Sequence, residues 1–225
     1  MGLVSTAEFH AVLASAVHEL KNSLSNVNRL IQDLSELYPE SNQEKLLLEC
    51  ETNRMNNYLS QLLVLYKIEA DAFKPRIDEH IAEDIILDVL AVQEALCSVN
   101  KLTLHSSCEE NLLCYCDNDL VTNALNTLIQ NAQRYAIAHI KISASLQDGY
   151  IAFCVEDDGP GLPEKLLHHQ PLVKNPTDLK NNNFGLGLYF VSTIAQMHKN
   201  STKTGQLQMD NLSELGGARF SLLIP

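Results

Sequence analysis

The sequence predicts an α plus α/β protein, in which a helical hairpin is followed by an α/β sandwich domain. Helically spaced apolar residues continue from Phe9 to about Ala70. After Phe73-Lys74-Pro75 the pattern changes to short strand-like and helix-like segments that alternate. Strands and helices mixed in this way over the rest of the 225-residue chain are typical of an α/β sandwich. We therefore expect two domains, 1–72 and 73–225.

The first part is expected to contain two long helices. From Phe9 to about Leu37 the apolar residues alternate steps of three and four, which is the period of a helix. The segment Tyr38-Pro39-Glu40-Ser41-Asn42 ends this helix, because proline cannot continue a helix interior. A second helical run reaches about Ala70, and its apolar stripe contains Leu48, Met55, Leu59, Leu62 and Tyr66. One hairpin cannot cover both sides of its apolar seam, whereas two hairpins can do so as a four-helix bundle. We therefore expect a homodimer.

The second part is expected to contain three helices and six strands. Asp117-Asn118-Asp119 supplies N-cap chemistry for the middle helix, which should run to about Ala136. The other helices are expected at about Ile81–Asn100 and Leu188–His198, and a loop at 162–184. The expected strands are Lys101–Ser106, Asn111–Cys116, His139–Ser145, Tyr150–Glu156, Gly205–Met209 and Ala218–Ile224.

The charge balance excludes several classes of partner. Lys and Arg number 16 against 28 Asp and Glu, which gives a net charge of -12. This charge argues against a general nucleic-acid binder and against docking on anionic lipid. No stretch is long and apolar enough to cross a bilayer, and the first residues lack a basic signal-peptide region. The six cysteines are scattered through apolar segments, so we expect small buried side chains in a reduced, cytoplasmic protein.

His18 lies off the apolar seam of the first helix. Steps of three or four from it give the polar residues Ser15, Asn22, Ser25, Arg29 and Gln32. Its side chain should therefore face solvent, with Glu19 beside it. One interpretation is an ordinary solvated helix face. The other is a nucleophile, because a neutral imidazole can attack phosphorus when a neighbouring carboxylate accepts its proton. Asn22, one turn further on, can orient a water molecule.

A predicted strand ends in a D-x-G-x-G motif formed by Asp157, Gly159 and Gly161. A carboxylate at a strand end can accept a hydrogen bond from an exocyclic amine, which suits adenine. The glycines let the backbone approach a ligand closely. The alternative is an ordinary Asp/Gly/Pro turn, which is common after strands.

Two further segments favour a nucleotide. Asn183-Phe184-Gly185-Leu186-Gly187-Leu188 opens a helix, and the free N–H groups at a helix start suit phosphate. The preceding residues, 165–184, carry three lysines against one aspartate, which suggests either a lid over phosphates or a solvated loop. On the helix before the D-x-G-x-G motif, the Asn131 oxygen suits Mg²⁺, Arg134 can meet a phosphate, and Tyr135 can flank a purine.

Together, in this order, these segments resemble those of bacterial two-component sensor histidine kinases. The first part resembles their dimerisation and histidine-phosphotransfer hairpin, through His18-Glu19-Leu20-Lys21-Asn22. The second resembles their catalytic ATP-binding domain, of the type shared with gyrase and a heat-shock chaperone. That resemblance runs through Asn131-Ala132, the D-x-G-x-G motif, Gly185-Leu186-Gly187-Leu188 and Gly216-Gly217-Ala218-Arg219-Phe220.

The resemblance implies a role for each of these residues. His18 would be the phosphoacceptor, Glu19 its acid/base partner, and Asn22 the residue that positions water to hydrolyse an aspartyl phosphate. Asn131 would hold Mg²⁺ and Asp157 would bind the adenine of ATP. The remaining ATP-binding residues would be Arg134, Tyr135, Gly159, Gly161, Gly185, Leu186, Gly187 and Leu188.

Three features depart from the family pattern. Ser23 stands where the family usually has a proline that bends the helix. Thr127 stands where a second asparagine often precedes the Mg²⁺ ligand by one turn, which bears on metal or water binding. The lid is short and lacks the usual pair of phenylalanines.

The function expected from the resemblance is an ATP-dependent protein-histidine kinase. It would autophosphorylate His18, pass the phosphoryl group to an aspartate in the receiver domain of a response regulator, and also dephosphorylate that regulator. Only 17 residues precede His18, so we expect input from a separate cytosolic sensor, unless the chain is a fragment. The alternatives are a phosphotransfer hub with a weakened ATP site, and a phosphatase or scaffold of the same fold.

Overall fold

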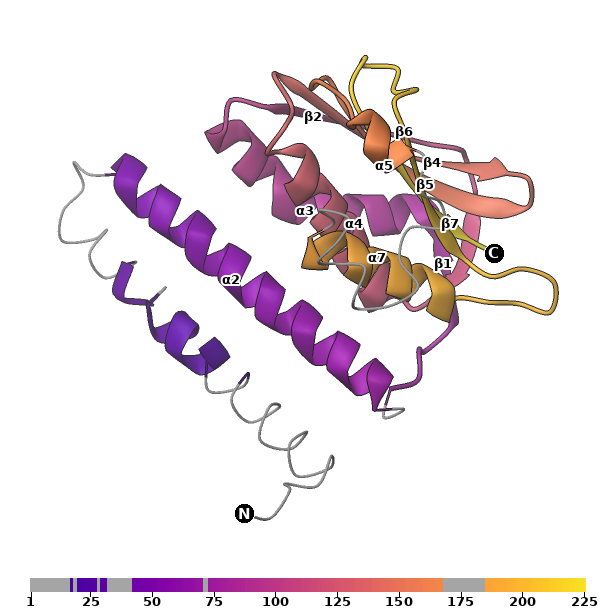
Figure 1. Cartoon of the computed structure of the whole chain (residues 1–225), viewed down its shortest axis with the longest axis horizontal. Coiled ribbons are helices and arrows are strands. Elements are labelled where there is room, and N and C mark those ends of the chain that lie inside the picture. Colours follow the sequence, from indigo (N-terminus) through magenta and orange to yellow (C-terminus); the bar gives the residue numbers. More distant parts are fainter. Residues whose placement is uncertain (1–16, 18–19, 28, 32–41, 71–72, 168–184) are drawn as a thin grey trace, which may run out of the picture. The chain divides into compact units, whose positions relative to one another are not determined.

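The computed structural model describes residues 17, 20–27, 29–31, 42–70, 73–167 and 185–225 (Figure 1). The chain divides into two compact units, Met1–Phe73 and Lys74–Pro225. Each unit is described by itself. Among the described helices, none has both the length and the apolar character that crossing a membrane requires.

The first unit contains two helical segments in contact with each other. Residues 20–27 and 29–31 are helical, and α2 spans Asn42–Glu69. The Lys21 Nζ donates a hydrogen bond to the Ser60 Oγ at 3.0 Å, which joins the two segments. The expected second helix is confirmed as α2. Most of the remaining expected first helix lies outside the described residues.

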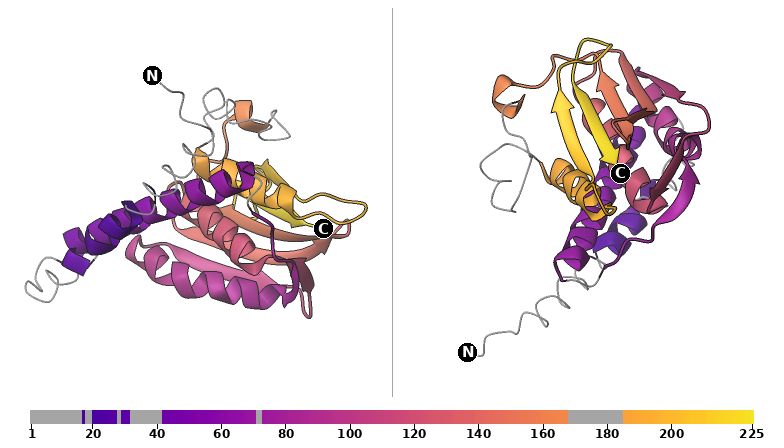
Figure 2. Two further views of the ribbon diagram at one scale, coloured as in Figure 1. Left: turned by 90° about the horizontal axis from the view of Figure 1, so that it is seen from below. Right: turned by 90° about the vertical axis from the view of Figure 1, so that its right-hand side faces the viewer.

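The second unit is built on a five-stranded sheet in the order β2-β4-β5-β7-β6 (Figure 2). Strand β2 pairs parallel to β4, and the other neighbouring strands are antiparallel. The five strands are Thr103–Cys108 (β2), His139–Gln147 (β4), Tyr150–Asp157 (β5), Gln206–Asp210 (β6) and Arg219–Ile224 (β7). A separate two-stranded sheet pairs β1 (Asp78–Ile81) with β3 (Leu113–Cys116).

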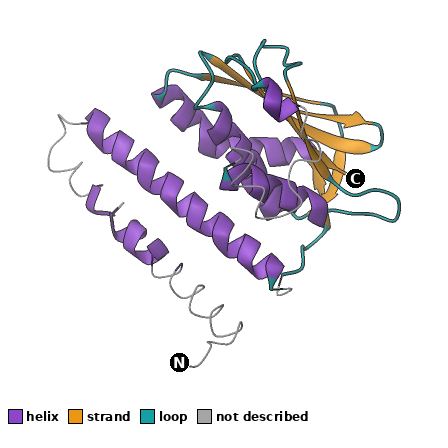
Figure 3. Ribbon diagram, viewed as in Figure 1, coloured by secondary structure: helices purple, strands orange, loops and turns teal. Residues whose placement is uncertain are grey.

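Three helices cover one face of the five-stranded sheet: α3 (Ala82–Val99), α4 (Asn118–Ala132) and α7 (Leu186–Met197) (Figure 3). Apolar and polar residues alternate along β4, and this alternation determines which side chains face the helices. Ile140 and Ile142 are fully buried against the helices, whereas Lys141 and Ser143 lie on the opposite face. The helices and this sheet face form the hydrophobic core, which confirms the expected α/β sandwich.

The structure corrects three details of the predicted second part. Helix α4 ends at Ala132 rather than near Ala136, because a turn follows in which Tyr135 and Ala136 both donate to the Ala132 carbonyl. A short helix, α5 (Glu164–Leu167), begins where a loop was expected. Strand β1 was missed because it is short and polar, and its partner β3 is distant in sequence, so no local signal marks it.

Candidate functional site

Asp157 is the last residue of β5, and its side chain is almost fully buried, at 2 % exposure. Its Oδ1 accepts hydrogen bonds from the backbone N–H groups of Gly159 (2.9 Å) and Ala218 (3.2 Å). Burial raises the pKa of this carboxyl above its ordinary value, and the two backbone donors partly oppose that effect. The carboxylate is therefore held in one orientation by main-chain groups on two segments distant in sequence.

The loop between β6 and β7 closes around the same residue. The Gly217 N–H and the Ser213 hydroxyl both donate to the Asp157 carbonyl, each at 3.0 Å. A Cβ at Gly217 would overlap the Asp157 carboxylate and carbonyl oxygens, so only glycine allows this approach. Ser213 is not among the site residues expected from the sequence, and Gly217 is named there only within a segment that resembles the family, without a role. The double glycine before the last strand was the available signal, because such glycines often mark close backbone contacts.

The two glycines of the D-x-G-x-G motif are required for different structural reasons. Gly159 is buried against the turn that follows α4, and a Cβ there would overlap the Tyr135 carbonyl oxygen. Gly161 has φ +76°, in the left-handed region that favours glycine. The motif is therefore more constrained than an ordinary turn.

The end of α4 carries the next group of expected site residues. Asn131 lies in the last turn of α4 and is half-buried. Arg134 and Tyr135 follow in the turn, and both are exposed. The Gly159 contact brings this turn against the end of β5, so the structure places Asp157 and Tyr135 in neighbouring segments.

Helix α7 begins at the glycine motif. Gly185 is its N-cap residue, and having no side chain it cannot cap the first backbone N–H groups of the helix. Leu186, Gly187 and Leu188 form the first turn and are half-buried. A Cβ at Gly187 would lie 2.9 Å from the Thr127 Cγ2, so the start of α7 packs closely against α4, one turn before Asn131. Helix α4 thus contacts the glycine motif that starts α7, and the turn that follows α4 contacts the D-x-G-x-G motif.

His198 fixes the other ends of these two helices. It is the C-cap of α7, and its Nε2 accepts a hydrogen bond from the backbone N–H of Asp117, the N-cap of α4, at 3.0 Å. The ring proton must therefore lie on Nδ1, which bonds to the Ile194 carbonyl at 2.8 Å. Burial lowers the pKa of His198, and the Ile194 carbonyl and Asp117 oppose this effect. The imidazole is a neutral link between α4 and α7.

The expected residues of the first part are only partly described. Asn22 is exposed on the helical segment 20–27 of the first unit. His18 and Glu19 lie outside the described residues, as does most of the lysine-bearing segment 165–184. The described geometry therefore concerns the second unit, which offers a buried acceptor, an amide oxygen and a helix start without a capping side chain.

Comparisons with known proteins agree with this geometry. Residues 116–225 match the family described as histidine kinase-, DNA gyrase B-, and HSP90-like ATPase. The chain is 28% identical over 215 residues to the sensor protein BasS of Salmonella typhimurium, which covers 94% of the chain and 58% of that protein. It is 24% identical over 195 residues to the sensor histidine kinase CssS of Bacillus subtilis, covering 84% of the chain and 42% of that protein. The chain therefore spans about half the length of these relatives.

A solved structure shares the fold. The histidine kinase AdeS of Acinetobacter baumannii aligns with a TM-score of 0.61 at 22% identity, covering 92% of this chain and 96% of that one. At this identity the likeness establishes the architecture alone. The matched family model, which covers residues 116–225, and the sensor-kinase relatives support a two-component histidine kinase catalytic domain in this chain.

Proposed function

We propose that this protein is an ATP-dependent protein-histidine kinase of two-component signalling. The observation that carries the proposal is the fixed Asp157 carboxylate. The turn that follows α4 packs against Gly159, two residues from Asp157, and the start of α7 packs on α4 itself. Both backbone bonds to the carboxylate reach Oδ1, so Oδ2 is the oxygen that an adenine amine would meet. Tyr135, exposed in the adjoining turn, would flank the purine.

The phosphates would lie at the start of α7. The N–H groups of Leu186 and Gly187 belong to the first turn, where the helix dipole favours negative charge. The Leu188 N–H instead donates to the Gly185 carbonyl at 3.2 Å. Arg134 would add a positive charge. Gly159 and Gly161 would let the main chain approach the nucleotide.

Asn131 fits a role in holding Mg²⁺, because a carboxamide oxygen is a hard ligand of the kind this ion prefers. Within the described residues, no group of three or more His, Cys, Asp or Glu could hold a metal. An ion here would therefore depend on oxygens from the nucleotide, which is usual for Mg²⁺ in kinases. When bound, Mg²⁺ would neutralise charge on the phosphates.

His18 would act as the nucleophile. Its ring nitrogen would attack the γ-phosphorus, the bond between that phosphorus and the β,γ-bridging oxygen would break, and ADP would leave. Glu19 would take the imidazole proton. The phosphoryl group would then pass to an aspartate of a response regulator, and Asn22 would orient the water that later hydrolyses that aspartyl phosphate. This chemistry depends chiefly on positioning.

The exposed apolar residues of the first unit support a homodimer. Leu20, Val27, Leu48, Met55 and Leu62 are between 42 and 54% exposed in the single chain, although all five belong to the apolar stripes that predicted the hairpin. Burial of such side chains is worth about 1.5–3 kcal/mol each. A second copy would cover them in a four-helix bundle.

One observation favours a second candidate, a phosphotransfer hub or phosphatase with a weakened ATP site. Thr127 takes the position of the family's second asparagine, and its hydroxyl donates to the Asn123 carbonyl at 2.8 Å. That hydroxyl is thus engaged within its own helix. The site keeps its other expected groups, so we place the kinase first.

Autophosphorylation with γ-labelled ATP and Mg²⁺ tests the proposal. Wild-type protein should acquire acid-labile label, His18→Ala should acquire none, and Asp157→Asn should acquire little. His105→Ala is the matched control, because His105 is an exposed histidine of β2 outside the proposed site. Asn22→Ala should keep autophosphorylation and lose phosphatase activity toward the regulator. Nucleotide binding without any label would favour the second candidate, and label retained in His18→Ala would remove His18 from its role.

A further inference from the structure

Three consecutive acidic residues, Glu156, Asp157 and Asp158, end β5 and begin the following loop. Only Asp157 belongs to the proposed adenine site. Three carboxylates in sequence repel one another, and Asp158 indeed contributes to raising the pKa of Asp157. The two flanking side chains must therefore have favourable partners of their own.

Asp158 bonds to the turn that follows α4. Its Oδ1 accepts from the Ile137 N–H (2.7 Å) and the Ala138 N–H (3.1 Å), while its Oδ2 accepts from Ala138 (3.0 Å) and His139 (3.1 Å). Burial acts to raise the pKa of Asp158, but these backbone donors outweigh it and lower the pKa. The carboxylate is thus charged and bonded to three successive main-chain groups.

This turn is a wall of the proposed adenine site. It begins at Tyr135, whose carbonyl lies against Gly159, and it ends where β4 starts at His139. Asp158 therefore ties the turn to the residue directly after Asp157. Without that carboxylate, the three N–H groups would lose their hydrogen-bond acceptor. The segment that begins at Tyr135 would then no longer be bonded to Asp158.

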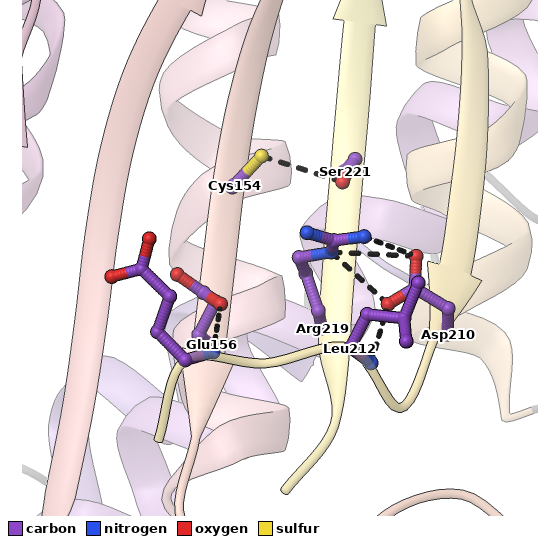
Figure 4. A network of polar contacts seen from close by, with 7 residues as sticks. Cys154, Glu156, Asp210, Leu212, Arg219 and Ser221 are labelled. Atoms are coloured by element: carbon purple, nitrogen blue, oxygen red, sulfur yellow. Dashed lines mark hydrogen bonds and ion pairs between the residues drawn. The ribbon is translucent and has the colours of Figure 1, made fainter. Parts of the chain in front are cut away.

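Glu156 bonds to the loop on the other side. Its side chain is only 4% exposed, although it lies on the sheet face opposite the helices, and its Oε1 accepts from the Glu214 N–H at 2.8 Å. Figure 4 shows this carboxylate beside the loop, next to Arg219, which forms an ion pair with Asp210. The same loop supplies the Ser213, Gly217 and Ala218 groups that bond to Asp157.

We propose that Glu156 and Asp158 are positioning residues for adenine recognition, each holding one of the two loops that orient Asp157 and Tyr135. The inference rests on the proposed function, because it assumes that adenine binds at Asp157. Neither flanking carboxylate contacts the base. Each acts through main-chain groups of a loop, Asp158 through residues 137–139 and Glu156 through residue 214.

A purely structural role predicts something different. If the two acids only stabilised the fold, their loss would lower the unfolding temperature and weaken all nucleotides alike. If they orient Asp157, their loss should weaken ATP more than inosine triphosphate, whose base lacks the exocyclic amine. The ratio of the two dissociation constants is therefore the informative quantity.

The experiment measures Kd for ATP and for inosine triphosphate, with Mg²⁺, on the full chain and its variants. For Asp158→Ala the preference for ATP should fall about tenfold, because several charge-assisted bonds are lost. For Glu156→Ala, which loses one such bond, it should fall about threefold. Glu156→Gln keeps an acceptor oxygen and should restore the preference. Lys141→Met removes the exposed ion pair with Glu214 and serves as the control, with an expected change below about twofold.

The outcomes distinguish a failure of the proposed function from a failure of the positioning role of Glu156 and Asp158. Wild-type protein that binds no ATP would overturn the proposed function and this inference with it. Wild-type protein that prefers ATP, with folded alanine variants that keep the same preference, would overturn the inference alone. If either alanine variant fails to fold, Ser213→Ala and Asp158→Asn replace them, with an expected loss of about threefold. Unchanged preference in both would again overturn it.

Discussion

The two ends of the candidate site are built in opposite ways. At the β5 end, the Asp157 carboxylate and carbonyl accept hydrogen bonds from Gly159, Ser213, Gly217 and Ala218. At the α7 end, the helix starts on a glycine that offers no capping side chain. Asp157 at the first end is held by four main-chain and side-chain donors, whereas among the described residues no side chain caps the first N–H groups of α7 at the second end. Substitutions should therefore damage the two ends by different mechanisms.

The largest expected effect comes from adding one methyl group at each end. Gly217→Ala would force a Cβ into the Asp157 oxygens, and overpacking of this kind costs about 1–3 kcal/mol. ATP binding should weaken by about tenfold or more as Asp157 moves. At Gly185 a Cβ would meet no described atom within 4 Å, so Gly185→Ala should change the unfolding free energy by about 0.5 kcal/mol or less. Urea unfolding and nucleotide titration of both variants check this contrast.

Equal losses of stability in Gly217→Ala and Gly185→Ala would contradict the expected difference between the two ends of the site. That result would mean that the packing around Gly217 can relax, and that the β5 end is not preformed.

A second prediction separates binding from folding at the β5 end. Asp157→Asn keeps an oxygen that can accept from Gly159 and Ala218, but replaces the other oxygen by an amide donor. The variant should fold, with an unfolding temperature near that of the wild type. Its affinity for ATP should fall about tenfold to a hundredfold, because the adenine amine would face a donor.

Calorimetric titration with ATP measures this loss, and Asp148→Asn, in the β4–β5 turn, serves as the control. An Asp157→Asn variant with wild-type affinity would remove Asp157 from base recognition.

Sequence patterns predicted the order of most elements of the second unit, because each carries its own local signal. The alternation in β4 and the Asp117 cap of α4, which accepts from the Leu120 N–H, are examples. The contacts that unite the site were not predictable in this way. The bonds from Ser213 and Gly217 to Asp157 join residues that local periodicity cannot relate, and the His198 link depends on where two helix ends meet.

A third prediction concerns the contact between α4 and α7. Gly187→Ala would bring a Cβ to 2.9 Å from the Thr127 Cγ2, and this strain opposes the gain of about 1 kcal/mol from replacing a helical glycine. Thr127→Ser removes that methyl and keeps the hydroxyl that donates to Asn123. The unfolding free energy of the double variant should exceed the value expected from adding the two single changes by about 1 kcal/mol. A double-mutant cycle by urea unfolding measures this coupling.

Additive effects would show that a Cβ at position 187 does not clash with the Thr127 methyl group. The start of α7 would then be less closely packed against α4 than the structure indicates.

The smallest expected effect is a pH dependence set by His198, which lies away from both glycine motifs. Its folded pKa is lowered, so the unfolded chain binds the proton more readily, and stability rises with pH. Stability should therefore be lost as pH falls through about 6.5, the ordinary pKa of histidine. His198 Nε2 now accepts a hydrogen bond from the Asp117 N–H, and protonation would place a second N–H group opposite that donor. The Asp117 carboxylate is already bonded to the backbone N–H groups of Leu120 and Arg76. Compared with the wild type, His198→Gln should flatten the dependence of the unfolding free energy on pH between about pH 5.5 and 7.5. If His198→Gln kept the wild-type slope, the link between α4 and α7 would not depend on a neutral imidazole at His198, and the packing between the two helices would have to hold them without it.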